Sequence, residues 1–173
     1  RQLDETIEVN VTNVPPVANA VAVGSTEIYR TESVEFDASG SIDPDCDDIA
    51  EYLWDFDGDE SYGDAYDQGA DVNPIKVYTD LGIFDVRLKV VDVLGGEDTT
   101  VDPITVTVNN HPPIACAEIT NEMPYWIDED IFFSAECSSD ADGSIAGWEW
   151  DLGADGSYEK SGEIAVSYTH LTL

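Results

Sequence analysis

Basic residues are scarce in this chain: Lys and Arg together number 6, against 38 Asp and Glu, so the formal net charge is −32. A polyanion of this kind repels nucleic acids and anionic membranes, and neither is expected as a partner. Self-repulsion of this size also destabilises a compact fold unless cations screen it. The composition therefore predicts either bound divalent cations or a very salty medium.

Long apolar runs are also missing. Although 42% of the residues are hydrophobic, which is enough to build cores, no run is long enough to cross a membrane. The chain starts at Arg1 without an initiator Met, which indicates a processed or excised piece. The lack of a signal peptide therefore carries little weight.

Cysteine is rare, and Cys46, Cys116 and Cys137 do not have the spacing of a zinc site. Cys116 and Cys137 are candidates for a disulfide if the compartment is oxidising, which leaves Cys46 free or bonded to another chain. Three buried thiols are the alternative.

Catalytic motifs are absent as well. The two histidines, His111 and His170, accompany no Gly-x-Ser-x-Gly nucleophile motif, and the chain has no phosphate-binding glycine loop. The abundance of acids makes any pair of carboxylates uninformative about glycoside hydrolysis. We expect a protein that is not an enzyme.

A repeat organises the chain. IEVNVTNVPPVANA at residues 7–20 parallels ITVTVNNHPPIACA at residues 104–117, with Pro15 and Pro112 lying 97 residues apart. A period of this length suits one β-sandwich. We expect three segments: residues 1–12 as the last strand of a preceding repeat or a donor strand, 13–109 as one module, and 110–173 as a second module shortened at its C-terminal end.

Strand periodicity runs through the repeat. Phe84, Val86, Leu88 and Val90 alternate with polar residues, and Ile104, Val106 and Val108 alternate with threonines. Helical periodicity is weak, and a helical turn is expected at most at residues 61–68. The prediction is an all-β chain of tandem immunoglobulin-like sandwiches joined by Pro-Pro linkers, which limit the orientations between modules.

The two ends predict open edges. Residues 6–11 match the last strand of the repeat, whereas the second copy has no counterpart for much of residues 82–108. Open edges recruit strands, so the chain is either an excerpt of a longer array or a subunit completed by strand exchange with neighbouring copies. The tail SYTHLTL, residues 167–173, departs from the repeat.

Both copies carry aspartates at alternating positions in turn-rich loops. Such loops supply the oxygens that calcium prefers, and glycine allows the sharp bend. The alternative is that these aspartates accept hydrogen bonds from nearby backbone N–H groups and only shape the turns. The candidate ligands are Asp43, Asp45, Asp47, Asp55, Asp57 and Asp59 in the first copy, and Asp140, Asp142, Asp151 and Asp155 in the second.

The joint pattern resembles the PKD (polycystic kidney disease) domain family: Val34-x-Phe36-Asp-Ala-Ser-Gly-Ser, Asp43-Pro-Asp45, Tyr52-x-Trp54-Asp-Phe, and Tyr78-Thr-x-x-Gly-x-Phe84. This resemblance implies an immunoglobulin-like sandwich used outside the cell as a spacer, adhesion or interaction module. It also implies calcium near the start of each module, which adds Asn13 and Asn110 as candidate ligands. Cys46 stands where the family usually has glycine, so a positive φ is disfavoured there and this loop is expected to differ from its copy at Gly143.

Aromatic residues and one sequon complete the candidates. Trp54 and Trp150 are expected in the sandwich cores. Tyr125 and Trp126 are candidates for an exposed sugar- or protein-binding spot, the alternative being a loop folded onto the sandwich. Asn10 begins an Asn-Val-Thr tripeptide and is a candidate for glycosylation.

Three functions follow from these observations. The leading hypothesis is an extracellular or cell-surface array stiffened by calcium, forming a stalk, surface layer or fibre with further repeats or copies of itself as neighbours. The second is an adhesin or a glycan- or protein-binding accessory module of a secreted enzyme. The third is an acidic surface protein adapted to high salt, which predicts acids on every face instead of in loops.

Overall fold

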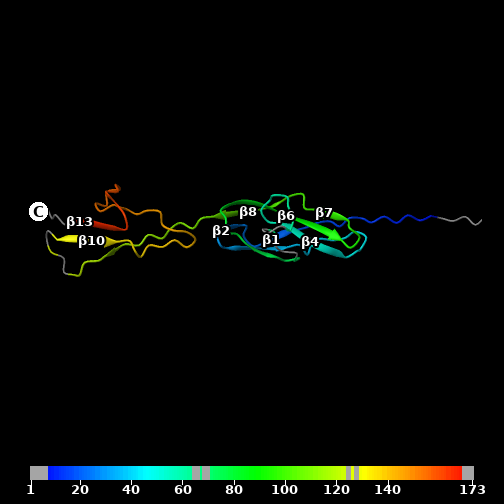
Figure 1. The fold of residues 1–173 in the computed structure, drawn as a ribbon, viewed down its shortest axis with the longest axis horizontal. Coiled ribbons are helices and arrows are strands. Elements are labelled where there is room, and N and C mark those ends of the chain that lie inside the picture. The colour runs from blue at the N-terminus through cyan, green and yellow to red at the C-terminus, as the bar shows by residue number, and fades with distance from the viewer. Residues whose placement is uncertain (1–7, 64–66, 68–70, 124–125, 127–128, 169–173) are drawn as a thin grey trace, which may run out of the picture. The chain divides into compact units, whose positions relative to one another are not determined.

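A computed structural model describes residues 8–63, 67, 71–123, 126 and 129–168 of the chain. Every regular element in these ranges is a β-strand, which confirms the predicted all-β class (Figure 1). The chain divides into two compact units, residues 1–109 and 110–173. Among the described residues, no helix has the length and apolar character that a membrane crossing requires.

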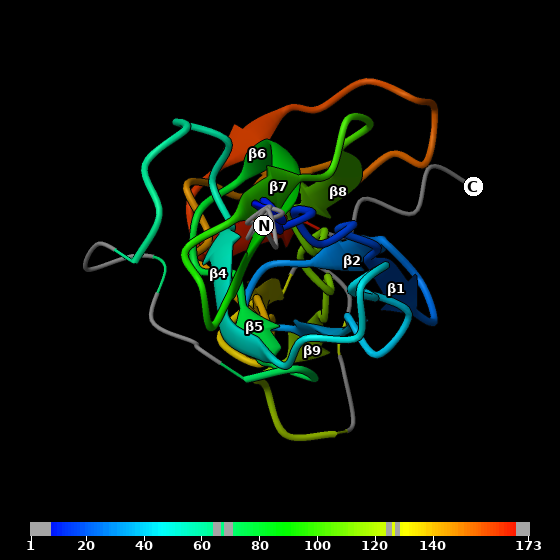
Figure 2. The same cartoon turned by 90° about the vertical axis from the view of Figure 1, so that its right-hand side faces the viewer.

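Two sheets form the first unit (Figure 2). The smaller has the order β1-β3-β5, with β1 at Val21–Val23, β3 at Ser33–Asp37 and β5 at Ile75–Val77, all antiparallel. The larger has the order β2-β8-β6-β4, and β7 also pairs with β6. Its strands are β2 (Glu27–Tyr29), β4 (Ile49–Asp55), β6 (Gly82–Asp92), β7 (Glu97–Thr99) and β8 (Ile104–Asn109).

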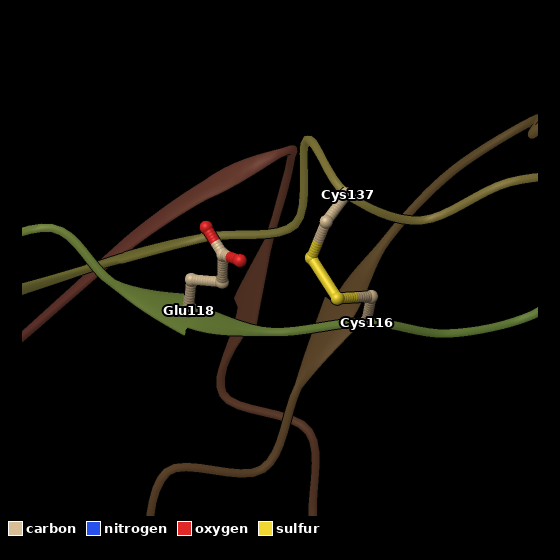
Figure 3. A group of neighbouring side chains, drawn as sticks. All are labelled: Cys116, Glu118 and Cys137. Carbon is tan, nitrogen blue, oxygen red and sulfur yellow. A yellow bond between two sulfur atoms is a disulfide. The ribbon is translucent and has the colours of Figure 1, made fainter.

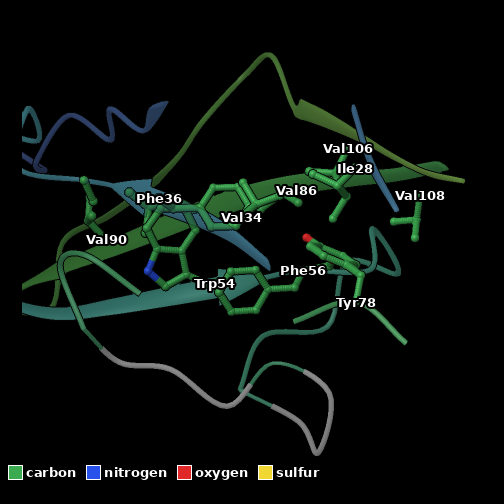
Figure 4. Close-up of a cluster of buried hydrophobic side chains, with 12 residues drawn as sticks. Ile28, Val34, Phe36, Trp54, Phe56, Tyr78, Val86, Val90, Val106 and Val108 are labelled. Atoms are coloured by element: carbon green, nitrogen blue, oxygen red, sulfur yellow. The ribbon is translucent and has the colours of Figure 1, made fainter. Parts of the chain in front are cut away.

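The core of the first unit lies between these sheets and is built around Trp54 (Figure 4). Trp54 is fully buried, as predicted, and its ring stacks on Phe56 at 5.7 Å between centroids and contacts Phe36 at 5.5 Å. Its indole N–H donates to the Asp71 carbonyl at 3.0 Å, so the polar atom of the buried ring is satisfied.

The predicted alternation in strands β6 and β8 is confirmed. Val86, Leu88 and Val90 are fully buried, whereas Arg87 and Lys89 between them face outward. Asp92 continues the inward-facing positions and is only 2% exposed. An acid therefore sits where the pattern calls for an apolar side chain, and this position belongs to the loop site described below.

The second unit has a three-stranded sheet of order β13-β10-β9 and a small hairpin of β11 and β12. The strands are β9 (Glu118–Ile119), β10 (Asp130–Ser134), β11 (Glu149–Trp150), β12 (Lys160–Ser161) and β13 (Ile164–Tyr168). Trp150 packs against Phe133 at 6.0 Å between ring centroids, but it is only half-buried. Trp150 therefore packs against the sheet of this unit, as expected of a core position, but part of its surface stays exposed.

The terminal and loop predictions have mixed outcomes. Residues 8–12 form no strand, and Val9 and Val11 are 79% and 87% exposed; residues 6 and 7 lie outside the described residues. Residues 61–63 and 67 contain no helical turn, and the rest of the predicted turn is not described. In the tail, Ser167 and Tyr168 pair with Ile131 and Asp130 of β10, so the fold extends into its first two residues; residues 169–173 are outside the described range.

Candidate calcium-binding loops

The loop after β3 folds around Asp43 and Asp45. The Asp43 carboxylate accepts a hydrogen bond from the Asp45 amide at 3.0 Å, and the Asp45 carboxylate accepts one from the Val14 amide at 2.9 Å. The second oxygen of Asp43, Oδ2, is enclosed and accepts no hydrogen bond from the described residues. A buried carboxylate oxygen without a donor is costly, which is the condition that a bound cation would relieve.

The carboxyl groups of Asp43 and Asp45 are neighbours in this loop. This contact raises the pKa of Asp43 from its ordinary value, with burial adding to the rise, and lowers the pKa of Asp45. Asp47 contributes its backbone N–H to Asp45. The structure thus brings the predicted pair together and gives Asp47 a backbone role in the same loop.

Asn13 is connected to this loop by a hydrogen bond to Asp92. The Asn13 amide donates to Asp92 Oδ2 at 2.7 Å, while Asp92 Oδ1 accepts from the amides of Leu94 and Gly96 at 2.7 and 2.9 Å. These bonds, that of Asn13 first, lower the pKa of Asp92. The negative charge of Asp92 also acts to raise the pKa of Asp43 and of Asp45, so Asp92 lies near this pair.

Sequence reasoning missed Asp92, although a signal was present. In strand β6 it occupies an inward-facing position two residues after Val90, and a buried acid at such a position needs partners. Gly96 is part of the arrangement, because a Cβ there would lie 2.6 Å from the Asn13 amide nitrogen and would collide with Asp92.

Cys46 corrects one expectation. The sequence predicts that a non-glycine residue avoids positive φ at this position, yet Cys46 has φ 71°. Gly143, its counterpart in the second unit, is not among the residues of positive φ. The two loops do differ, but the positive φ is at the cysteine and not at the glycine. The hydrogen bonds of the Asp43–Asp45 turn outweigh the modest strain of a left-handed cysteine.

A second group of acids lies in the loops that follow β4. Carboxylate oxygens of Asp55, Asp57, Asp59 and Asp67 all lie within 4.8 Å of one another. Asp55 and Asp67 are 0% and 1% exposed, and burial raises the pKa of Asp55. Three predicted residues are therefore joined by Asp67, which the sequence did not single out because it comes from a separate part of the loop.

The same acids also shape the turn. Asp55 accepts hydrogen bonds from the amides of Gly58 and Glu60 at 2.7 and 3.0 Å, and Asp67 accepts one from the Phe56 amide at 2.8 Å. Asp57 accepts from the Asp59 amide at 3.2 Å. These aspartates therefore do act as hydrogen-bond acceptors that shape the turn, which was the alternative interpretation. Each carboxylate has more lone pairs than these bonds use, and the unused ones remain available to a cation.

The second unit repeats the first loop in part. Asp140 accepts a hydrogen bond from the Asp142 amide at 3.2 Å, and Asp142 accepts one from the His111 amide at 2.9 Å, matching the bonds of Asp43 and Asp45. Asn110 differs from Asn13, since its amide donates to the His111 carbonyl. The structure thus gives Asn110 a different partner from the carboxylate that Asn13 contacts.

The loop after Trp150 holds a thinner cluster. Oxygens of Asp151, Asp155 and Glu159 lie within 4.8 Å of one another, and Glu159 is an addition to the predicted set. Asp151 accepts hydrogen bonds from the amides of Asp155 and Gly156 at 3.2 and 2.9 Å. Asp151 is more exposed than Asp55, the corresponding acid of the first unit, so its charge is screened more by solvent.

Cys116 and Cys137 form a disulfide in the structure, and Cys46 is a free, exposed thiol. Figure 3 shows the bond with Glu118 on the adjoining strand β9. Because the two sulfurs are bonded to each other, this group is not a thiolate metal site. Ser138 lies next to the bond, where its hydroxyl donates to the Cys116 carbonyl and accepts from the Cys116 amide, both at 3.0 Å.

The donor sets of these loops suit calcium better than a softer metal. They consist of carboxylate oxygens, without histidine or thiolate, and calcium takes six to eight oxygen ligands in flexible geometry. Oxygens that lie within 4.8 Å of one another fit around one ion at the usual calcium–oxygen distance of about 2.4 Å. The enclosed oxygen of Asp43 that accepts no hydrogen bond also favours a bound cation.

Two predicted surface features are accessible. Trp126 is 70% exposed, while its neighbour Tyr125 lies outside the described residues. Asn10 is exposed in a segment without regular structure, as a glycosylation acceptor must be. Modification of Asn10 and ligand binding by Trp126 remain predictions.

Comparisons with known proteins identify one family model and several solved structures that are similar to this chain. A family model described as PKD domain matches residues 13–108, more than half of the chain. The PKD1 domain of Vibrio cholerae metalloprotease PrtV is 30% identical, with 54% of this chain and 99% of that domain covered and a TM-score of 0.41. The PKD1 domain of Vibrio anguillarum Epp is 28% identical, with 57% of this chain and 100% of that domain covered and a TM-score of 0.42. A structure from a study of carbohydrate-binding modules of the β-sandwich superfamily is 22% identical, with 73% of this chain but only 56% of that one covered and a TM-score of 0.47.

Proposed function

Because the chain belongs to the PKD domain family, we propose that it is a non-catalytic, extracellular structural array whose modules are stiffened by calcium. Its neighbours in the array are further repeats of the same kind, in the same chain or in other copies. The family match covers the first unit, and the internal repeat extends the proposal to the second.

The observation that carries this proposal is the convergence of Asp55, Asp57, Asp59 and Asp67. Four carboxylates at this separation repel one another strongly when all are ionised, most of all where two are buried. A divalent cation replaces that repulsion with attraction. It would also join the segment after β4 to the separate position of Asp67, which restrains the loop.

The loop at the start of the module supports the same role. Asn13, Asp43, Asp45 and Asp92 would hold a cation immediately before the Pro15-Pro16 pair, and Asp140 and Asp142 occupy the equivalent place in the second unit. Cross-linking the beginning of a module to its loops restrains the chain where one module follows another.

Strand donation belongs to this proposal. Residues 8–12 alternate like β8 and expose Val9 and Val11, which supports their addition to a neighbouring module. The scarcity of bases and the accessible Asn10 also fit an extracellular surface.

Calorimetric titration of the chelator-treated protein with calcium chloride tests the proposal. We expect saturable binding with a Kd of about 10⁻⁴–10⁻³ M, the range of extracellular calcium modules. Asp57→Asn removes a ligand charge without removing the backbone contacts of Asp55, so we expect it to weaken the site in that loop by about tenfold.

Glu51→Gln is the matched control, because it removes the same charge from an exposed position on β4. The proposal fails if no saturable binding occurs, or if Glu51→Gln weakens binding as much as Asp57→Asn. The second result, together with stabilisation by molar sodium chloride alone, would support an acidic surface adapted to high salt.

A second candidate function is glycan or protein binding by the second unit, favoured by the exposure of Trp126. Exposed tryptophan supplies a flat apolar platform on which sugar rings and protein side chains pack. If this function holds, titration with a panel of soluble oligosaccharides changes the tryptophan fluorescence, and Trp126→Ala abolishes the change. If the fluorescence still changes to the same extent in Trp126→Ala, Trp126 is not the binding site.

A further inference from the structure

The outer face of the sheet β1-β3-β5 carries an unusual arrangement of side chains. Val21 and Val23 on β1 are 52% and 48% exposed, and Ile75 and Val77 on β5 are 67% and 51% exposed. They form two aliphatic columns on opposite sides of β3. These side chains are not needed for the core, which is filled from the opposite face of the same strands.

Acidic side chains stand between the two columns. Val34 and Phe36 of β3 point inward and are buried, so Ser33, Glu35 and Asp37 point outward. The strand register places Glu35 between Val23 and Ile75 in one row across the sheet. Hydrogen bonds from Ser39 lower the pKa of Asp37, which keeps that carboxylate ionised. The face is thus a column of negative charge bordered by aliphatic surface.

We propose that this face binds an extended basic segment of another protein, in which Lys or Arg recurs at every second residue. Such side chains point to one face of the segment about 6.6–6.8 Å apart, which equals the spacing of Glu35 and Asp37 along β3. Their aliphatic stems cover the valine and isoleucine columns while the cationic ends reach the carboxylates. The overall charge of −32 adds long-range attraction for a basic partner.

A second copy of this chain does not fit the same face. Packing two such sheets against each other would bring the acidic columns together, and like charges in an interface cost affinity. The second unit is an internal contrast, because Phe132 stands at the position equivalent to Glu35, 97 residues further on. Phe132 is 41% exposed and carries no charge, so the negative charge that Glu35 places at the centre of this face occurs in the first unit and not at the equivalent position of the second. The inference is independent of the calcium proposal, since none of these residues belongs to a candidate ligand set.

Fluorescence anisotropy with two synthetic peptides tests the proposal on the whole chain. One labelled peptide alternates lysine and threonine, and the other has the same composition with all lysines at one end. At an ionic strength of roughly 0.15 M, where distant charges are screened, we expect the alternating peptide to bind about tenfold more tightly. Glu35→Gln and Ile75→Ser should each weaken that binding by about fivefold or more.

Matched controls lie on the other sheet. Glu27→Gln removes the same charge from β2, and Ile83→Ser removes an equally exposed isoleucine from β6. Both should bind like the unmodified protein. The proposal is overturned if the two peptides bind equally, if the controls weaken binding as much as Glu35→Gln, or if Ile75→Ser instead abolishes self-association seen by analytical ultracentrifugation. The first two outcomes mean unspecific attraction to a polyanion, and the third means a contact between copies.

Discussion

Calcium is expected to raise the melting temperature of the first unit. An ion that binds the folded loops and not the unfolded chain stabilises the fold by about 2.7 kcal/mol when its concentration is 100 times the Kd. For a module of this size, that corresponds to roughly 10–20 °C in Tm. The physical source is the group of Asp55, Asp57, Asp59 and Asp67, whose mutual repulsion opposes folding when no cation is bound.

Differential scanning calorimetry at low salt, with excess EDTA or excess calcium, measures this shift. Asp57→Asn should lose most of the calcium-dependent shift in the first unit, while Glu51→Gln should keep it. Sodium chloride at matched ionic strength separates specific binding from screening, because screening does not require convergent ligands. Equal melting temperatures in EDTA and in calcium would rule out calcium as a stabilising ligand.

Reduction of the Cys116–Cys137 disulfide is expected to destabilise the second unit by about 3 kcal/mol, the loop-closure effect of a bond of this span. The bonded cysteines are 21 residues apart in sequence. The second unit has few buried apolar side chains in its described part, namely Ile131, Ala135 and Ala165. A unit with a small core depends more on a covalent restraint. Cys137 is exposed, so a soluble reductant can reach the bond.

Denaturant unfolding with and without a reductant measures this effect. Trp54→Phe removes the tryptophan of the first unit, so the remaining fluorescence reports the second. In this variant the midpoint of the second unit should fall on reduction, whereas the transition of the first unit, followed by Trp54 in the unmodified protein, should stay unchanged. An unchanged second midpoint would mean that the bond contributes no stability.

The first unit offers a reciprocal control. Asn19 and Gly40 occupy the positions equivalent to Cys116 and Cys137, and a Cβ on Gly40 would lie 3.0 Å from the Asn19 side chain. The double variant Asn19→Cys/Gly40→Cys should therefore form a second disulfide and make the first unit sensitive to reductant. If that disulfide forms and the first unit still melts identically under both conditions, the loop-closure explanation is wrong for this fold.

Local patterns in the sequence were sufficient for the strands and the first acid loop. The alternation of Val86, Leu88 and Val90 predicts β6 because neighbouring side chains on a strand face opposite sides. Asp43 and Asp45 are two residues apart, so a single turn is enough to bring them together. The Pro-Pro anchors likewise indicated a boundary near residue 110, where the contacts of the chain divide.

Contacts between residues far apart in the chain could not be predicted from the sequence. Asp67 comes close to Asp55 through its hydrogen bond with the Phe56 amide, 11 residues away in sequence, and Asp92 meets Asn13 across 79 residues. The left-handed Cys46 was missed for a similar reason: intrinsic preference favours glycine there, but the hydrogen bonds of the surrounding loop decide the backbone.

The sequence by itself determined the all-β class, the repeat, the acidic character and the residue types available as ligands, because these depend on composition and on short periodicities. Only the tertiary structure decided which acids converge, which are buried, and which aliphatic side chains remain on the outer face of β1-β3-β5. The reason is physical: repulsion among carboxylates and exposure of apolar surface depend on distances through space, and these are set by sheet pairing between segments far apart in the chain.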